Sequence, residues 1–225
     1  ALCAWAVTPR VLSGSHAMNS SKPVCERGGM PSKKEALLEA AKELFGELGY
    51  AETTFKKISD KAGVALGLLT HHYGNKEKLF LASGLDVLEN FHSFLENAVK
   101  HSPDGYTAVM RFCRAYLDFS LDKNSNWLVL VRCSPYSDMK TGADRDLMDA
   151  RFANILEMLA ELLETGMNDG SIAPMNSNAL AQVIVSLMVG ANRTMLLTPY
   201  APANLYDDVL NFVSRALKSC RGAAE

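Results

Sequence analysis

An all-α fold is predicted by three observations on the 225-residue chain. From Ser32 onward, apolar residues recur at the three- and four-residue spacing of one helix face. Residues that start and stop helices divide this pattern into segments. No stretch shows the alternation typical of a strand, and we find no internal repeat. With 48% hydrophobic residues, the chain is long enough to bury a sizeable core.

Capping and breaking residues predict the first two helices. A helix begins after Ser32, which forms a capping box with a glutamate three positions later. It ends at Gly49, where a left-handed residue is expected. Thr53-Thr54 then caps a second helix over 55–62, and Gly63 follows it.

A third helix of about two turns is predicted over 66–73, with Gly63 before it and Gly74-Asn75 after it. A helix this short is marginal alone, so neighbours must hold it. Two short helices joined by a glycine-containing turn form a helix-turn-helix pattern. In that pattern the second helix is short enough to enter the major groove of DNA, which is about 12 Å wide.

Six more helices are predicted downstream. A long helix is capped by Asn75 and broken at Asp104-Gly105, and a loop spans 135–142. The other five cover roughly 105–122, 125–134, 144–167, 176–197 and 203–219. The 176–197 helix is apolar on nearly every side, so every side must be covered. We expect the last two helices to contact a second subunit; a purely intramolecular core is the alternative.

The charge is mildly uneven around a net value of −2. Residues 1–82 hold eleven Lys/Arg and eight Asp/Glu, and residues 83–225 hold twelve and seventeen. A basic front and an acidic back favour two different partners, and the overall composition is not that of a polyanion binder. No apolar run approaches the roughly 20 residues of a membrane span, so no membrane partner is expected.

The cysteines and the first residues suggest a cytoplasmic protein with an irregular leader. The five cysteines are odd in number and form no C-x-x-C pair, which favours reduced thiols over a disulfide framework; redox sensing is the alternative. They are Cys3, Cys25, Cys113, Cys133 and Cys220. Residues 1–29 have no helical period and are expected to be a disordered tail, an expression remnant or an upstream extension. Met18 and Met30 are both plausible starts, with Met30 favoured.

A longer pattern over residues 33–80 points to one family. Its residues are Leu38, Ala40, Ala41, Leu44, Phe45, Gly49, Tyr50, Thr53, Thr54, Ile58, Ala62, Gly63, Val64, Gly67, Leu69, His72, Tyr73, Lys76, Glu77 and Leu79. With these residues the segment resembles the DNA-binding domain of TetR-family transcriptional regulators. The resemblance implies a helix-turn-helix domain over 30–80 and a helical regulatory and dimerisation domain over 81–225. It also implies an Ω-shaped homodimer in which the last two helices form the interface.

The candidate DNA contacts lie on the second and third helices and at the start of the fourth. They are Thr54, Lys56, Lys57, Ala65, Leu66, Gly67, Leu68, Thr70, His71, His72 and Lys76. The lysines are candidates for phosphate contacts, Lys76 because it starts a helix; ordinary surface lysines are the alternative. No Lys or Arg lies between 65 and 73, which excludes guanine-directed arginine from this helix. The base contacts that remain possible are thymine methyls packed against Leu66 or Leu68 and hydrogen bonds from Thr70 and His71.

Two departures from the family pattern affect this helix. Ala65 stands where the family often has a capping serine, and such a cap is typically worth about 1 kcal/mol. Thr70 stands where a phosphate-contacting tyrosine is common, and its hydroxyl is shorter. The adjacent His71 and His72 point about 100° apart on a helix, so we expect no metal site.

A ligand pocket is expected in the downstream helices. Its candidates are Phe112, Tyr116, Phe119, Trp127, Arg151, Met158, Met188 and Arg193. Aromatic and methionine residues at this spacing are also typical of plain core. The two arginines lie within apolar patterns, where pairing with a carboxylate, exposure to solvent and contact with an anionic ligand are the alternatives.

The sequence therefore predicts a DNA-binding regulator with no enzymatic activity and no cofactor. We expect a homodimeric repressor of a double-stranded operator, controlled by an unknown small-molecule effector. Two alternatives remain. One is an all-α enzyme or carrier, although no nucleophile–base cluster is seen. The other is a protein-interaction module that uses Leu66 and Leu68 as an apolar patch.

Overall fold

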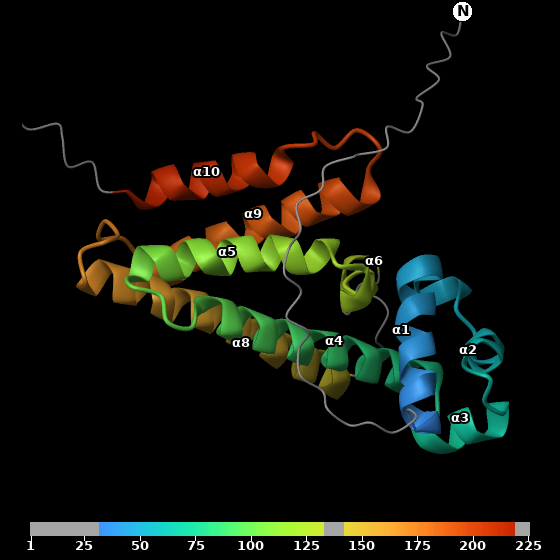
Figure 1. Ribbon diagram of the computed structural model, residues 1–225. Helices are drawn as coiled ribbons and strands as arrows, with labels where there is room; N and C mark the ends of the chain where they lie inside the picture. Colours follow the sequence, from blue (N-terminus) through green and yellow to red (C-terminus); the bar gives the residue numbers. More distant parts are fainter. Residues whose placement is uncertain (1–31, 133–141, 219–225) are drawn as a thin grey trace, which may run out of the picture. The chain divides into compact units, whose positions relative to one another are not determined.

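The computed structural model of the protein describes residues 32–132 and 142–218, and all described elements are helical (Figure 1). The predictions for the leader, for the 135–142 loop and for Cys3, Cys25, Cys133 and Cys220 lie outside these residues. The described chain from Ser32 onward belongs to one compact unit. The predicted all-α fold is confirmed.

The first three helices form a group that we call the head. They are α1 (Lys33–Glu52), α2 (Phe55–Ala62) and α3 (Leu66–Tyr73). The capping box is present, since the Ser32 amide donates to Glu35 Oε2 at 2.8 Å and the Glu35 amide donates to Ser32 Oγ at 3.2 Å. Gly49 has φ 80°, so regular helix stops where predicted, although one more turn continues to Glu52.

The sequence predicts Thr53 and Thr54 together as one cap, but in the structure each residue caps a different helix end. The buried Thr53 hydroxyl donates to the carbonyls of Leu44 at 3.0 Å and Gly49 at 2.8 Å, at the end of α1. The Thr54 hydroxyl accepts the Lys57 amide at 3.2 Å and is the N-cap of α2. The chain can therefore close one helix and open the next within two residues.

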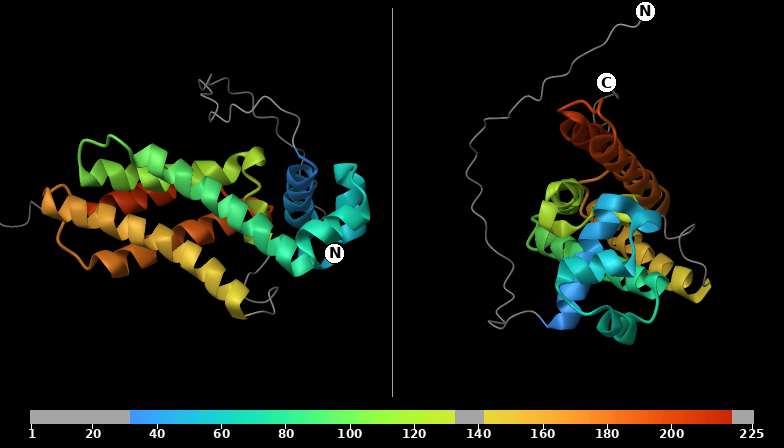
Figure 2. Two further views of the ribbon diagram at one scale, coloured as in Figure 1. Left: turned by 90° about the horizontal axis from the view of Figure 1, so that it is seen from below. Right: turned by 90° about the vertical axis from the view of Figure 1, so that its right-hand side faces the viewer.

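The helix α4 (Lys76–Val99) joins the head to the remaining helices (Figure 2). Its Phe80 ring lies 5.2 Å from the ring of Phe45 and 5.1 Å from that of Tyr50, so the start of α4 completes the head core. The predicted domain boundary between 80 and 81 falls within this continuous helix. The helix ends at Val99, before the predicted break. Asp104 is instead the N-cap of the next helix, where its side chain accepts the Thr107 amide.

The helices after α4 form what we call the body. They are α5 (Gly105–Leu121), the 3-10 turn η1 (Lys123–Ser125), α6 (Leu128–Arg132), α8 (Gly142–Asn168), α9 (Ser177–Leu197) and α10 (Leu205–Leu217). The single helix predicted over 125–134 was wrong in its first part. Asn126 is left-handed, with φ 55°, and this conformation separates η1 from α6.

Packing between segments that are far apart in the sequence determines how the body helices are arranged. Aromatic rings from α4, from α5 and from Trp127, directly before α6, contact one another: Phe91 lies 5.0 Å from Tyr116 and 4.6 Å from Trp127 between ring centroids. At the far end α5 crosses α8 so closely that a Cβ on Gly105 would lie 2.1 Å from the Gly166 amide nitrogen. Only glycine fits at such a crossing.

A buried polar network joins α5, α9 and α10. The Tyr206 hydroxyl donates to Asn192 Oδ1 at 2.7 Å, and it also lies 2.9 Å from the Ser120 hydroxyl. Burial raises the pKa of Tyr206. Because buried polar groups without partners destabilise a fold, this network favours one relative placement of the three helices.

The outer face of α9 and α10 remains apolar and exposed within the described chain. Val183 is 60% exposed, Val189 43% and Phe212 62%. Among the described helices, α9 alone is long and apolar enough, by length and composition, to cross a membrane, and 28% of its most apolar window is buried. The sequence predicts that this helix is covered on every side. Within the described chain, α9 is covered on one side only.

Candidate nucleic-acid interface

The turn between α2 and α3 has the geometry that a helix-turn-helix requires. Gly63 is left-handed, with φ 64° and ψ 29°. Its amide donates to the Asp60 carbonyl at 3.3 Å, and the Val64 amide donates to the Ser59 carbonyl at 3.0 Å. These bonds close the end of α2 and turn the chain into α3. The predicted role of Gly63 is confirmed.

The short helix α3 is held by one side, as predicted. Leu69 is fully buried, and one turn later the Tyr73 hydroxyl donates to the Lys34 carbonyl of α1 at 3.1 Å. Burial, followed by the charges of Asp86 and Glu35, raises the pKa of Tyr73. A helix too short to be stable alone is thus fixed to the head, and its other side is left open.

The start of α3 lacks a side-chain cap. Ala65 is the N-cap and makes no side-chain hydrogen bond. The first backbone bonds of the helix run from the Leu68 and Leu69 amides to the Ala65 carbonyl, at 3.0 and 3.4 Å. The amides of Leu66 and Gly67 come before these bonds, at the positive end of the helix dipole. Such amides form an anion-binding position suited to a phosphate.

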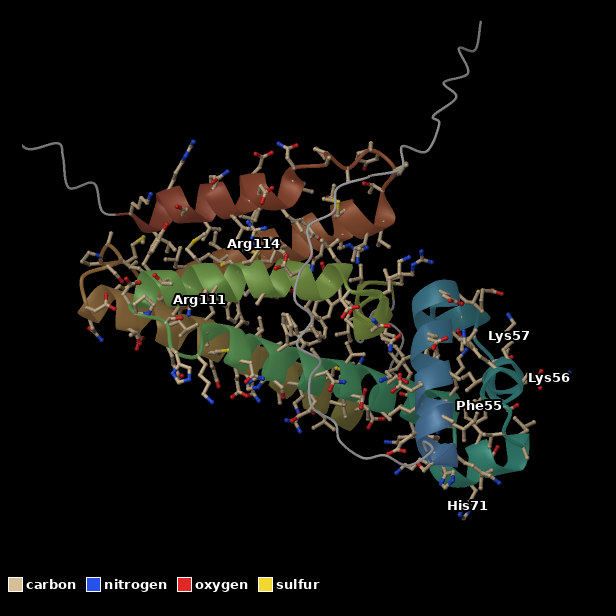
Figure 3. The ribbon with its side chains drawn as sticks, in the orientation of Figure 1. Phe55, Lys56, Lys57, His71, Arg111 and Arg114 are labelled. Carbon is tan, nitrogen blue, oxygen red and sulfur yellow. The ribbon has the colours of Figure 1, made fainter. Side chains whose placement is uncertain are left out.

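Most predicted DNA contacts are exposed on the head. Figure 3 shows Lys56 and Lys57 extending outward from α2 and His71 from α3. The exposed candidates are Thr54, Lys56, Lys57, Ala65, Leu66, Gly67, Thr70, His71 and His72, while Leu68 and Lys76 are half-buried. The Thr70 hydroxyl donates to the Leu66 carbonyl at 3.3 Å, within α3 itself.

Two of the three candidate lysines also donate hydrogen bonds to backbone carbonyls. Lys57 Nζ donates to the Glu52 carbonyl at 2.8 Å. Lys76 Nζ donates to the carbonyls of Ala51 at 3.3 Å and Thr53 at 3.0 Å, and it lies 4.3 Å from the Tyr50 ring centroid. An ammonium group has three hydrogens, and two from Lys76 point into the head. Its position ties α4 to the end of α1.

The sequence interpretation overlooked two further lysines. Lys33 and Lys34 are exposed at the start of α1, and the bond from Tyr73 to the Lys34 carbonyl places them beside the end of α3. A signal was present, since two adjacent lysines open the first helix of the head. Their nearness to α3 depends on a contact across 39 positions of the chain, which no local pattern shows.

The predicted pocket residues occupy several environments. Phe112, Tyr116, Phe119, Trp127 and Met188 are buried in the core. Trp127 also lines a cavity beside α1, and Met158 lines an open groove between α4 and α8. Arg151 is exposed, 3.7 Å from Glu89, and Arg193 donates to the Val131 carbonyl at 3.0 Å. Both arginines therefore have partners within the protein.

The described residues contain no group of three or more His, Cys, Asp or Glu side chains able to hold a metal ion. The rings of His71 and His72 lie 5.6 Å apart between centroids. Cys113, the one described cysteine that is free and buried, has its pKa raised to about 12 by burial. A thiol with such a pKa is unreactive near neutral pH.

The head matches a known family. Residues 37–83 match the sequence model described as "Bacterial regulatory proteins, tetR family". The chain belongs to the TetR family. Members of this family are transcription regulators that bind DNA, and they are not enzymes.

Relatives extend the similarity of this TetR-family chain beyond the head. The HTH-type transcriptional regulator YhgD of Bacillus subtilis (strain 168) is 25% identical over 157 residues, which cover 70% of this chain and 81% of YhgD. The HTH-type transcriptional repressor KstR2 of Mycolicibacterium smegmatis is 24% identical over 145 residues, covering 64% and 69%. A crystal structure of AibR in complex with isovaleryl coenzyme A and operator DNA has a TM-score of 0.68 at 18% identity, covering 82% and 97%. At that identity, the AibR structure shows a shared fold.

Restoring the missing cap should stabilise the third helix. We expect Ala65→Ser to increase the free energy of unfolding by about 1 kcal/mol, because a serine hydroxyl can accept an orphan amide of α3. Chemical denaturation of the full chain measures this change. The matched variant Ala65→Val offers no acceptor and should give no gain; an equal gain from both variants would contradict the capping explanation.

Proposed function

We propose that this TetR-family regulator represses transcription by binding an operator as a homodimer, with α3 in the major groove. The observation that carries the proposal is the exposed side of the helix-turn-helix. There, the uncapped amides of Leu66 and Gly67 and the exposed Lys56 lie on helices fixed by a buried core. Such a surface suits a phosphate backbone, and α3 is short enough for the groove.

Phosphate contacts and base contacts come from different residues in this proposal. Lys56, Lys57 and the overlooked Lys33 and Lys34 are exposed and positively charged, so we assign them to phosphates. Lys76 has its ammonium turned toward carbonyls of the head, and we assign it chiefly to positioning α4.

Base reading is assigned to the open side of α3. Leu66 is 47% exposed and Leu68 half-buried, so their methyl groups are available to thymine methyls. His71 is exposed and supplies hydrogen bonds, whereas the Thr70 hydroxyl is already directed to the Leu66 carbonyl. This chemistry favours an operator half-site in which A·T pairs face the centre of α3.

A second copy of the chain is the proposed cover for the open face of α9 and α10. Val183, Val189 and Phe212 form an exposed apolar surface on the last two helices. The exposed Ser186 and Gly190 lie between these side chains in sequence and allow two helices to approach closely. A dimer built on this face presents two α3 helices to successive half-sites of a near-palindromic operator.

Control by a small molecule is supported by relatives. KstR2 is named a repressor, and AibR was crystallised with both an acyl-coenzyme A and operator DNA. In this proposal an effector binds the body and favours a head spacing that does not match the half-sites. It can shift the equilibrium only by its differential affinity for the two states. The protein acts where its operator is, in the cytoplasm.

Salt dependence tests the DNA-binding surface. We expect the protein to bind random-sequence duplex DNA with a steep salt dependence, and Lys56→Ala to lower the slope of log K against log salt by about one unit. A fluorescence anisotropy titration over several salt concentrations measures both slopes.

A lysine of the body serves as the control for that titration. Lys100 is exposed at the far end of α4, and Lys100→Ala should leave the slope unchanged. If the wild type binds without salt dependence, the DNA-binding proposal fails. If DNA binding is absent while Leu66→Ala abolishes binding to a protein partner, the interaction-module alternative is favoured.

Oligomeric state tests the proposed subunit interface. We expect Val183→Asp to convert a dimer into monomers, because it places a charge on the apolar face. Leu147→Asp changes a side chain that is 42% exposed on α8 and should leave the dimer intact. Sedimentation velocity distinguishes the species; a dimer that persists in Val183→Asp would rule out this face.

A further inference from the structure

The open side of α3 carries one ionisable side chain near its centre, that of His71. Each residue of an α-helix is rotated by about 100° from the one before it. Leu69 and Tyr73, which fix α3 to the head, are each two positions from His71. His71 therefore lies about 160° around the helix axis from both of them. Its imidazole is exposed and extends outward from α3 (Figure 3), toward whatever the open side contacts.

The position one turn before His71 leaves room around the imidazole. Gly67 precedes His71 by four positions, so the two residues share one face of α3. An added Cβ on Gly67 would meet nothing within 4 Å among the described residues. A nucleic acid can therefore approach the backbone of α3 beside His71 without displacing a side chain.

The helix α3 has no fixed positive charge of its own. Its segment LGLLTHHY contains no Lys, Arg, Asp or Glu. His71 and His72 lie in its last turn, where the negative end of the helix dipole favours a cation. Histidine is the side chain that usually changes charge between about pH 5 and 8. A cation on this helix must therefore come from a proton that a histidine takes up.

The charged groups around α3 come from α1, α2 and α4, the helices packed against it. At the adjoining ends of these helices they are Lys33, Lys34 and Glu35 on α1, Asp60 and Lys61 on α2, and Lys76, Glu77 and Lys78 on α4. From farther along α4, the charge of Asp86 reaches Tyr73. Within the described residues, the His71 imidazole contacts the His72 ring and makes no hydrogen bond or ion pair. No described carboxylate therefore holds a proton on His71, whereas the phosphates of bound DNA would favour one there.

The neighbouring His72 limits the uptake to one proton. The centroids of the two imidazole rings are 5.6 Å apart, so a charge on one ring opposes a charge on the other. His72 is three positions from Leu69, which places it about 60° from the buried side, and its ring lies 6.4 Å from that of Tyr73. The proton is therefore assigned to His71, the histidine at the centre of the open side.

We propose that binding of DNA is coupled to the uptake of one proton by the His71 imidazole of each head, so that affinity for DNA rises as the pH falls. The inference rests on the proposed function, because it requires α3 to enter the major groove. The proton comes from solvent and binds the ring nitrogen that carries none, which makes both nitrogens donors and the ring positive. The negative potential between the two phosphate strands favours this charged form, and by linkage the proton favours bound DNA by the same factor.

Affinity at two pH values tests the coupling. We expect the wild type to bind a random-sequence duplex about fivefold or more tightly near pH 6 than near pH 8, at one fixed low salt concentration. Fluorescence anisotropy measures both affinities. Salt-dependent binding that is equal at the two pH values would overturn this inference and leave the proposed function standing. Absence of DNA binding at both values would overturn the proposed function and this inference with it.

Variants of His71 separate the proton on this residue from other effects of pH. His71→Gln keeps a hydrogen-bonding side chain that cannot be charged, so its affinity near pH 6 should be as low as near pH 8. His71→Lys is positive at both values and should bind with one high affinity. An affinity ratio unchanged from the wild type in His71→Gln would place the proton elsewhere and overturn the inference.

Two other histidines serve as controls for these variants. His92 lies on α4, where its side chain is 33% exposed and 3.6 Å from Glu96, and His92→Gln should keep the wild-type ratio. His72→Gln should also keep the ratio, whatever its effect on either affinity. Loss of the ratio in His72→Gln, with its retention in His71→Gln, would contradict the assignment to His71.

Proton uptake can also be counted directly. Isothermal titration calorimetry of DNA binding near pH 7, in buffers with different ionisation enthalpies, gives the number of protons taken up. We expect roughly one half to one proton per head in the wild type and almost none in His71→Gln. No uptake in the wild type, or equal uptake in both proteins, would overturn the inference.

Discussion

The buried ammonium of Lys42 is the interaction on which the attachment of the head to α4 depends. Lys42 belongs to α1, is 4% exposed, and bonds to Asp86 of α4 and Glu39 of its own helix. Burial alone lowers the pKa of Lys42, but the hydrogen bonds and charges of both carboxylates outweigh it, and the pKa is raised. Because a buried ammonium is stabilised by the carboxylates beside it, this contact joins α1 to α4.

Further contacts along α4 connect it to the head on one side and to the body on the other. Phe80 of α4 packs on the aromatic rings of α1, Lys76 bonds to carbonyls at the end of α1, and Lys78 pairs with Asp144 of α8 at 2.8 Å. A movement of α4 is therefore transmitted to the helix-turn-helix. This arrangement gives a physical route by which the body can set the position of α3, as the proposed control by an effector requires.

The head was predictable because its signals are local. The capping box at Ser32, the cap at Thr54 and the turn at Gly63 each act within four residues, and all three are present. The parts that sequence reasoning missed depend on distant contacts. The ammonium of Lys76 is turned to α1 by carbonyls more than twenty positions away, and Lys34 lies beside α3 only through Tyr73. The break at Asn126 was missed because left-handed asparagine has no sequence signal as strong as glycine.

We propose that the open side of α2 and α3 is the surface that faces DNA. Amide hydrogen exchange of the full chain, with and without a random-sequence duplex at low salt, tests this proposal. We expect DNA to protect amides within residues 54–76, those of Leu66 and Gly67 above all, and to leave the amides of α5 unchanged. Protection confined to the body, with none in α2 or α3, would contradict it.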